Sequence, residues 1–169
     1  MDITLDYTVL LEEVKRSLSI IGKRSTDDNG NLLFTDITVS TNEEYIIIDY
    51  FQQAVIDLAA ELSGFITTPA TAPATFPGGF PTGATITIDL PSNHSEAVEP
   101  FIQQSCNAYC VSYALYSWFT VTAPRISEKY NADCSRRANA VLRLVHQKEQ
   151  PDTPELTYAD IPGSVILNS

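Results

Sequence analysis

The stretch 100–149 constrains the fold most strongly, because it predicts two long helices that supply much of the core. Apolar and aromatic side chains recur through it at helical spacing, and it holds the only Trp and all three Cys of the chain. Ala123 and Pro124 predict a break between the two helices, since a helix tolerates proline mainly in its first turn. Charged side chains on the second helix predict a solvent-facing side.

Two further helices are predicted earlier in the chain. Apolar residues at helical spacing predict the first over 7–23, with Gly22 where a helix end is expected. Thr41 and Glu44 have the spacing of a capping box and predict the start of the second, which runs to about Ser63 and stops at Gly64. Its wide apolar face indicates packing on more than one side.

The composition changes sharply between the second and third predicted helices. Residues 67–83 are rich in Thr, Ala, Pro and Gly and carry no charge, so they form neither a helix nor a central strand. On either side, 65–68 and 84–90 alternate with period two, as half-buried strands do. We therefore predict a β-hairpin arm at about 65–90 with a Pro/Gly-rich tip, which either reaches a neighbouring subunit or is a disordered insertion.

Together these elements predict a mainly α fold. At 169 residues the chain is expected to form one domain. Residues 1–150 are predicted to be a four-helix bundle-like domain with the inserted β-arm, and 151–169 an extended C-terminal tail. The tail contains three prolines and an apolar segment at 165–167, which packs on the domain or on a partner.

The charge balance is acidic, with 21 Asp and Glu against 10 Lys and Arg. This argues against a surface that grips nucleic acid, which needs clustered cations to displace counterions. A local basic patch at Arg136, Arg137, Arg143 and Lys148 is the alternative to an ordinary solvated helix face. No basic n-region followed by an apolar run begins the sequence, and no apolar run has the length of a membrane span, so we expect neither a signal peptide nor a membrane segment.

One loop has the outline of a calcium site. Ser25, Asp27 and Asn29 alternate before Gly30, and Asp36 stands near the last ligand position. The first ligand is Ser and the last is Asp rather than a bidentate Glu, so a plain turn is the stronger interpretation. Cys106 and Cys110 are expected to be buried reduced thiols, and we predict no metal site and no cofactor.

No catalytic constellation is evident in the sequence. His94 and His146 are far apart in sequence, and neither lies beside a nucleophile and an orienting acid. The aromatic set that begins at Tyr109 and ends at Phe119 is more typical of a core or an interface than of a platform for bases. We therefore predict that the chain is not an enzyme.

The order of these elements, with two helices, a β-arm and further helices, resembles the head–tail connector (adaptor) proteins of tailed bacteriophages. In that family a first helix of the type Leu-x-Glu-Val-Lys is followed by an acidic loop, and here Leu11 begins Leu-Glu-Glu-Val-Lys before Asp27-Asp28. The second helix begins Asn42-Glu-Glu-Tyr and becomes Ala-rich, and the later helix ends in Tyr-Ser-Trp-Phe at Phe119. The resemblance covers roughly 8–66 and 97–120.

The resemblance implies a structural virion protein in the phage neck, assembled in the cytoplasm of the bacterial host. Copies of the chain would form a ring of about twelve subunits, as closed cyclic assemblies do. The implied partners are the portal and the tail or stopper proteins, with DNA only passing through the lumen. The arm and tail would clasp neighbours, which predicts these interface residues: Phe65, Phe76, Phe80, Ile86, Ile88, Val165, Ile166 and Leu167.

The arm tip, the long helix after Pro124 and the tail exceed the short family pattern and leave the neck layer open. Two other classes also stay open. One is a small helical protein-binding or regulatory module without catalytic activity, which would be a monomer with an ordered arm. The other is an enzyme with an aromatic cleft, which would need a deep pocket that holds His94 or His146 beside carboxylates.

Overall fold

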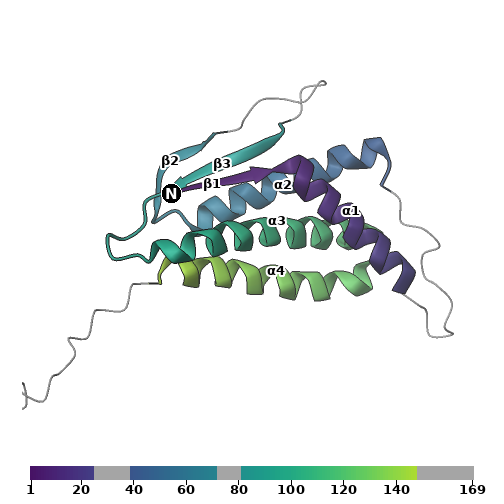
Figure 1. Cartoon of the computed structure of the whole chain (residues 1–169). Helices are drawn as coiled ribbons and strands as arrows, with labels where there is room; N and C mark the ends of the chain where they lie inside the picture. Colours follow the sequence, from purple (N-terminus) through teal and green to yellow (C-terminus); the bar gives the residue numbers. More distant parts are fainter. Residues whose placement is uncertain (25–38, 72–80, 148–169) are drawn as a thin grey trace, which may run out of the picture.

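The structure, a computed structural model, describes residues 1–24, 39–71 and 81–147 (Figure 1). The prediction of a mainly helical chain is confirmed. The elements follow one another in this order: β1 (Asp2–Asp6), α1 (Tyr7–Arg24), α2 (Thr41–Glu61), β2 (Ile66–Thr71), β3 (Gly83–Ile88), the short 3₁₀ helix η1 (Glu96–Val98), α3 (Glu99–Thr122) and α4 (Pro124–Val145).

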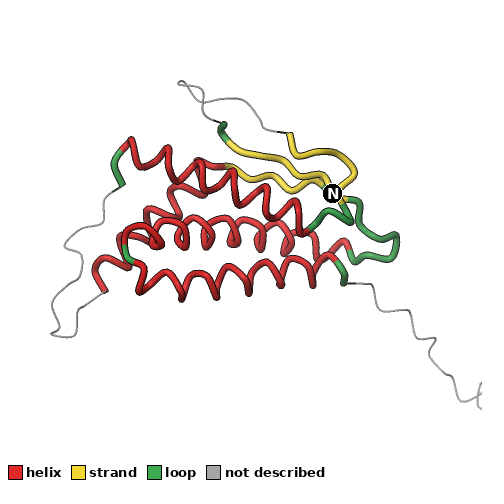
Figure 2. Tube along the Cα trace, turned by 180° about the vertical axis from the view of Figure 1, so that it is seen from behind, coloured by secondary structure: helices red, strands yellow, loops and turns green. Residues whose placement is uncertain are grey.

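Helix α3 is the centre of the molecule. It lies between α4 on one side and the layer formed by the sheet, α1 and α2 on the other (Figures 1 and 2). Ile102 and Val111 point in opposite directions from the helix axis, since nine residues are two and a half turns, and both are buried. A helix that is buried on opposite sides needs apolar side chains around most of its circumference, which explains the apolar composition of this stretch.

The expected break between the last two helices is confirmed. Helix α3 ends at Thr122, Ala123 has an extended φ of −153°, and α4 begins at Pro124. Proline lacks an N–H, and the first-turn N–H groups of a helix have no partner within the helix, so Pro124 costs α4 no hydrogen bond.

The three strands form one antiparallel sheet in the order β1-β3-β2. Strand β1 was not predicted, although Asp2–Asp6 alternates polar and apolar residues with period two. Ile3 and Leu5 face the core, and the three residues between and around them face solvent. The five pairs of β1 and β3 run from Asp2 opposite Thr87 to Asp6 opposite Gly83.

The position of β3 corrects the prediction of an arm. Strands were expected on either side of the Pro-rich segment, and β2 and β3 occupy these places. However, β3 is the central strand of the sheet, and its Ile86 and Ile88 side chains are 0% and 1% exposed. The hairpin is therefore anchored in the core along β3, because β1 pairs with it from the other side; the tip at 72–80 lies outside the described residues.

The helix ends differ from the predicted ones in three places. Ser40, one residue before the expected Thr41, caps α2: its N–H donates to Glu43 Oε2 at 2.7 Å, which lowers the pKa of Glu43. Helix α2 ends at Glu61 without help from Gly64, because Leu62 N–H already donates to Leu58 O at 3.0 Å. Helix α1 continues through Gly22 to Arg24.

Candidate functional site

The two edges of the sheet differ in a way that matters for binding. At the β1 edge, Thr4 N–H donates to Gln103 Oε1 at 2.9 Å, and Gln103 Nε2 donates to Thr4 O at 2.7 Å. The Gln103 amide also donates to Asn107 Oδ1 at 3.0 Å, which fixes its orientation on α3. A side-chain amide thus satisfies the backbone groups that another strand would otherwise use.

The β2 edge has no such cover among the residues that the structure describes. Its only strand partner there is β3, and the pairing is irregular between Ile66 and Thr71. Pro69 interrupts this edge, as expected for a strand that no second neighbour completes. A strand edge of this kind can accept a strand from another chain over a short stretch.

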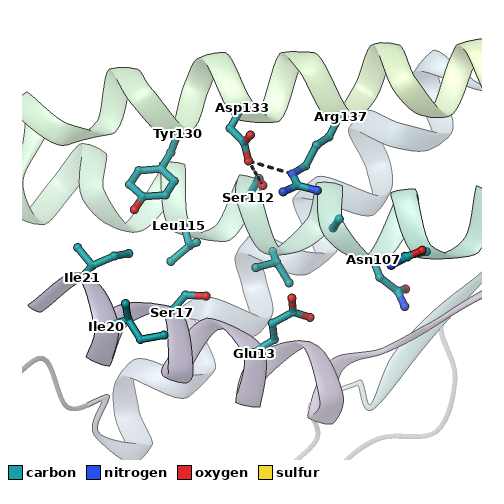
Figure 3. Close-up of a pocket in the computed structure, with 13 residues that line it drawn as sticks. Glu13, Ser17, Ile20, Ile21, Asn107, Ser112, Leu115, Tyr130, Asp133 and Arg137 are labelled. Carbon is teal, nitrogen blue, oxygen red and sulfur yellow. Dashed lines mark hydrogen bonds and ion pairs between the residues drawn. The ribbon is translucent and has the colours of Figure 1, made fainter. Parts of the chain in front are cut away.

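A groove of about 540 Å³ lies over α3, between α1 and α4 (Figure 3). Ile20 and Ile21 of α1 and Tyr130 of α4 form one end, with Leu115 of α3 between them. Towards the other end the lining becomes polar, through Glu13, Ser17, Asn107, Ser112, Asp133 and Arg137.

Asp133 is the centre of the polar part of this groove. Ser112 Oγ donates to Asp133 Oδ2 at 2.8 Å, Arg137 Nε donates to the same oxygen at 2.9 Å, and Arg136 pairs with Oδ1. Partial burial alone would raise the pKa of Asp133, but the hydrogen bonds from Arg137 and Ser112 outweigh it and the pKa is lowered. The cluster is a charged link between α3 and α4.

The three cysteines are free and buried, which confirms the prediction made for Cys106 and Cys110. Burial raises the pKa of Cys106 to about 12 and that of Cys134 to about 11, and it also raises the pKa of Cys110. The thiolate is the reactive form of cysteine, so these side chains act as small apolar groups at neutral pH. Tyr109 lies against the same core, where burial raises the pKa of its hydroxyl.

The two histidines lie outside the groove. His94 precedes η1, and neither ring nitrogen, although buried, has a hydrogen-bond partner in the described part of the chain. His146 follows α4 and is exposed, and its ring meets the edge of Phe65 with the centroids 5.0 Å apart. The groove lining contains neither ring, so the geometry does not bring a histidine to Asp133.

The predicted interface residues fall into three groups. Phe65 is partly buried and contacts His146. Ile86 and Ile88 belong to the core of the protomer, so their side chains offer no surface to a neighbour. The remaining five predicted residues lie outside the described ranges: Phe76, Phe80, Val165, Ile166 and Leu167.

Carboxylates gather at one more place on the surface. Asp2, Glu96 and Glu99 line a hollow of about 590 Å³ together with Met1 and Gln103. Within residues 1–24, 39–71 and 81–147, no group of His, Cys, Asp and Glu has the arrangement to hold a metal ion. The loop at 25–36, which has the outline of a calcium site, and Lys148 of the alternative basic patch lie outside these ranges.

Large apolar side chains are exposed on three helices. They are Val9 and Ile20 of α1, Ile46 and Ile56 of α2, and Phe101 and Val121 of α3. The sequence did not indicate that these side chains are exposed, nor the roles of Gln103 and Asp133, because spacing on one helix does not show which neighbour covers it.

Comparison of the chain with protein-family models, with curated proteins and with solved structures found no match. No helix among the described residues is both long and apolar enough to cross a membrane.

Proposed function

We propose that the chain is a structural protein of the head–tail junction of a tailed bacteriophage, where copies of it form a ring between the portal and the tail. The ring holds about twelve copies related by cyclic symmetry. Its partners are the portal on one face and a tail or stopper protein on the other, and DNA passes through its lumen. The function lies in these interfaces, and the protein catalyses no reaction.

The observation that carries this proposal is the asymmetry of the sheet. At one edge Gln103 satisfies the backbone N–H and C=O of Thr4, whereas β2 has no second strand partner in the described residues. An open edge is used when a segment of another chain adds to the sheet. In a ring, every copy supplies a segment to one neighbour and an open edge to the other.

The helical order supports the same proposal. The stretch that resembles the connector proteins, 8–66 and 97–120, coincides with α1, α2 and most of α3. In the proposed ring Phe76 and Phe80, which lie outside the described residues, contact the next copy. The tail residues Val165, Ile166 and Leu167 anchor on the same neighbour or on the portal.

The acidic surface suits a conduit for DNA. With a net charge of −11 the chain repels phosphates, so DNA slides past it without binding. Replacing carboxylates of the lumen by Lys should slow DNA release from phage particles. Each added Lys can neutralise a DNA phosphate and release a counterion, so the affinity of the lumen for DNA rises with the number of Lys. Release kinetics that do not change would refute this part of the proposal.

The proposal is tested by placing the protein in the particle. The full chain is mixed with the portal protein of the same phage, and the complex is examined by light scattering and negative-stain electron microscopy. A ring of about twelve copies on the portal is the expected result. Antibody labelling of intact particles should mark the neck. A chain that neither binds the portal nor occurs in particles would overturn the proposal.

The alternative is a small helical module that binds a single protein partner. The half-apolar groove over α3, with Ile20, Leu115 and Tyr130 at one end, is the feature that favours it. Such a module would remain monomeric with the portal present and would bind its partner in a ratio of one to one.

A further inference from the structure

The charges of the chain are separated in a way that its net charge hides. No Lys or Arg occurs anywhere from Thr41 to Thr122, the stretch from the start of α2 to the end of α3. Helix α4 has the opposite balance, with five cations and two carboxylates. The acidic residues of the cation-free stretch are Glu43, Glu44, Asp49, Asp57, Glu61, Asp89, Glu96 and Glu99.

Four of the five cations of α4 form one line along its solvent-exposed side. Residues spaced alternately by four and three fall on one side of a helix, because seven residues are close to two turns. The exposed line of α4 spans about 27 Å at 1.5 Å per residue. It consists of Arg125, Lys129, Ala132, Arg136, Asn139 and Arg143, all exposed.

Three of these four cations form no ion pair within the described residues, although Lys129 Nζ lies 6.0 Å from the ring centroid of Tyr130. In the described structure Arg125, Lys129 and Arg143 make no ion pair. Arg136 contacts Asp133, but 76% of its side chain remains exposed. The line lies on the side of α4 opposite its buried residues Cys134, Val141 and Val145, and α4 packs against α3.

Helix α2 carries an exposed line of the same spacing and length. Ile46 and Ile56 are 45% and 60% exposed within it, although both are large apolar side chains. The line is uncharged except for Asp49. It consists of Asn42, Ile46, Asp49, Gln53, Ile56 and Ala60, all exposed.

We propose that the exposed line of α4 in one copy docks along the exposed line of α2 in the next copy. Aligned antiparallel, the two lines place Asp49 opposite Arg136 and Ile56 beneath the aliphatic stem of Lys129. The small Ala132 lies opposite Gln53, which lets the two helices approach. This inference rests on the proposed function, because it names the contact that joins identical copies in the ring.

Charge complementarity favours a second copy over nucleic acid as the partner of α4. The α2 line offers exposed apolar surface as well as an anion, whereas a phosphate backbone would leave Ile46 and Ile56 uncovered. Two different faces of one chain meet in this contact, so it is heterologous and propagates into a ring or a filament.

Charge reversal tests the contact. Arg136→Glu and Asp49→Lys each place like charges at the docked position, and each should weaken self-association about tenfold or more in sedimentation velocity at low salt. Mixing the two variants in equal amounts, or combining both changes in one chain, restores an opposite pair and should restore association. If Arg136→Glu folds poorly, Arg136→Gln replaces it, because Gln adds no carboxylate beside Asp133. This variant should also weaken self-association.

The controls carry the same charge changes on other surfaces. Arg16→Glu on α1 and Asp89→Lys after β3 should leave association unchanged, since both side chains are exposed and neither belongs to the two lines. Circular dichroism of each variant checks that the fold is kept.

Several results would overturn the inference. One is a wild-type chain that stays monomeric at low salt and high concentration; another is association that neither reversal affects. If the wild type binds a DNA duplex and Arg136→Glu does not, the partner of the α4 line is a polyanion instead of a second copy. The proposed function fails separately, if the wild-type chain is absent from phage particles and does not bind the portal, whatever the two variants do.

Discussion

Replacing Gly83 by Ala should destabilise the protein strongly, because β1 lies against the backbone at this position. A Cβ atom on Gly83 would lie 2.2 Å from the carbonyl oxygen of Leu5. Side-chain carbons approach oxygen no closer than about 3 Å, so the two strands must separate by roughly 1 Å. The nearby hydrogen bond from Tyr7 N to Thr82 O, now 3.0 Å, would be lost.

The expected cost follows from two terms. An extra methyl group in a closely packed site costs about 1–3 kcal/mol of stability. Each backbone hydrogen bond that is lost costs about 1 kcal/mol more. If β1 detached completely, Ile3 and Leu5 would become exposed, and each would lose about 1.5–3 kcal/mol of burial free energy. Detachment of β1 therefore costs at least as much free energy as moving the two strands apart. We therefore expect Gly83→Ala to lower the free energy of unfolding by about 2–4 kcal/mol, a large share of the stability of a domain of this size.

Gly64→Ala is the matched control. No atom lies within 4 Å of the position of its added Cβ. The substitution should be neutral or stabilise by up to about 1 kcal/mol, because Ala restricts the unfolded chain. Urea unfolding followed by the fluorescence of Trp118, the only Trp, measures both variants. The reasoning is refuted if Gly83→Ala lies within about 0.5 kcal/mol of the wild type, a difference at the noise level of neutral surface substitutions.

Three further outcomes are expected. Gln103→Ala opens the β1 edge and should speed hydrogen exchange at the Thr4 amide, while its exposed neighbour Gln104→Ala should not; equal rates would refute the closing role. The pKa of Asp133 is lower in the folded protein than in the unfolded chain, where it is about 3.9. Asp133 therefore contributes fully to the free energy of unfolding above pH of about 3.9, and this contribution is lost as the pH falls through the folded-state pKa. The wild type should therefore exceed Asp133→Asn in unfolding free energy at pH 7 by about 1–2 kcal/mol but not at pH 2; a gap that is independent of pH would contradict this. The three cysteines should react with a thiol reagent at pH 8 only after unfolding, and rapid labelling of the native protein would show that they are accessible.

Much of the helical layout could be predicted from local signals in the sequence. Pro124 marks the break between α3 and α4, and the apolar spacing in Tyr7–Arg24 marks α1, because both signals act within a few residues. The cap of α2 was placed one residue late, since Ser40 and Thr41 both precede a Glu at the capping distance.

The sheet and the site could not be predicted in the same way. Strand β1 is only five residues long, too short for a periodic pattern to stand out, and its partner β3 is some eighty residues away in sequence. Gln103 closes the β1 edge from α3, and Asp133 joins Ser112 across two helices. These contacts depend on how the elements pack against one another. A single sequence shows which helix or strand a segment can form, but it does not show which segments become neighbours.

The pairing of β1 with β3 also sets an order for folding during synthesis. The first strand leaves the ribosome early, yet its partner Gly83–Ile88 and the closing residue Gln103 follow only after roughly 80–100 further residues, a delay of about 5–20 s at 5–20 residues per second. During that interval Ile3 and Leu5 have neither a sheet nor a core to enter. Thr4 separates these two apolar residues, and Asp2 and Asp6 flank them with charge, which keeps the unpaired segment from aggregating. Strand β1 is thus made well before the strand and the side chain that fix its place in the sheet.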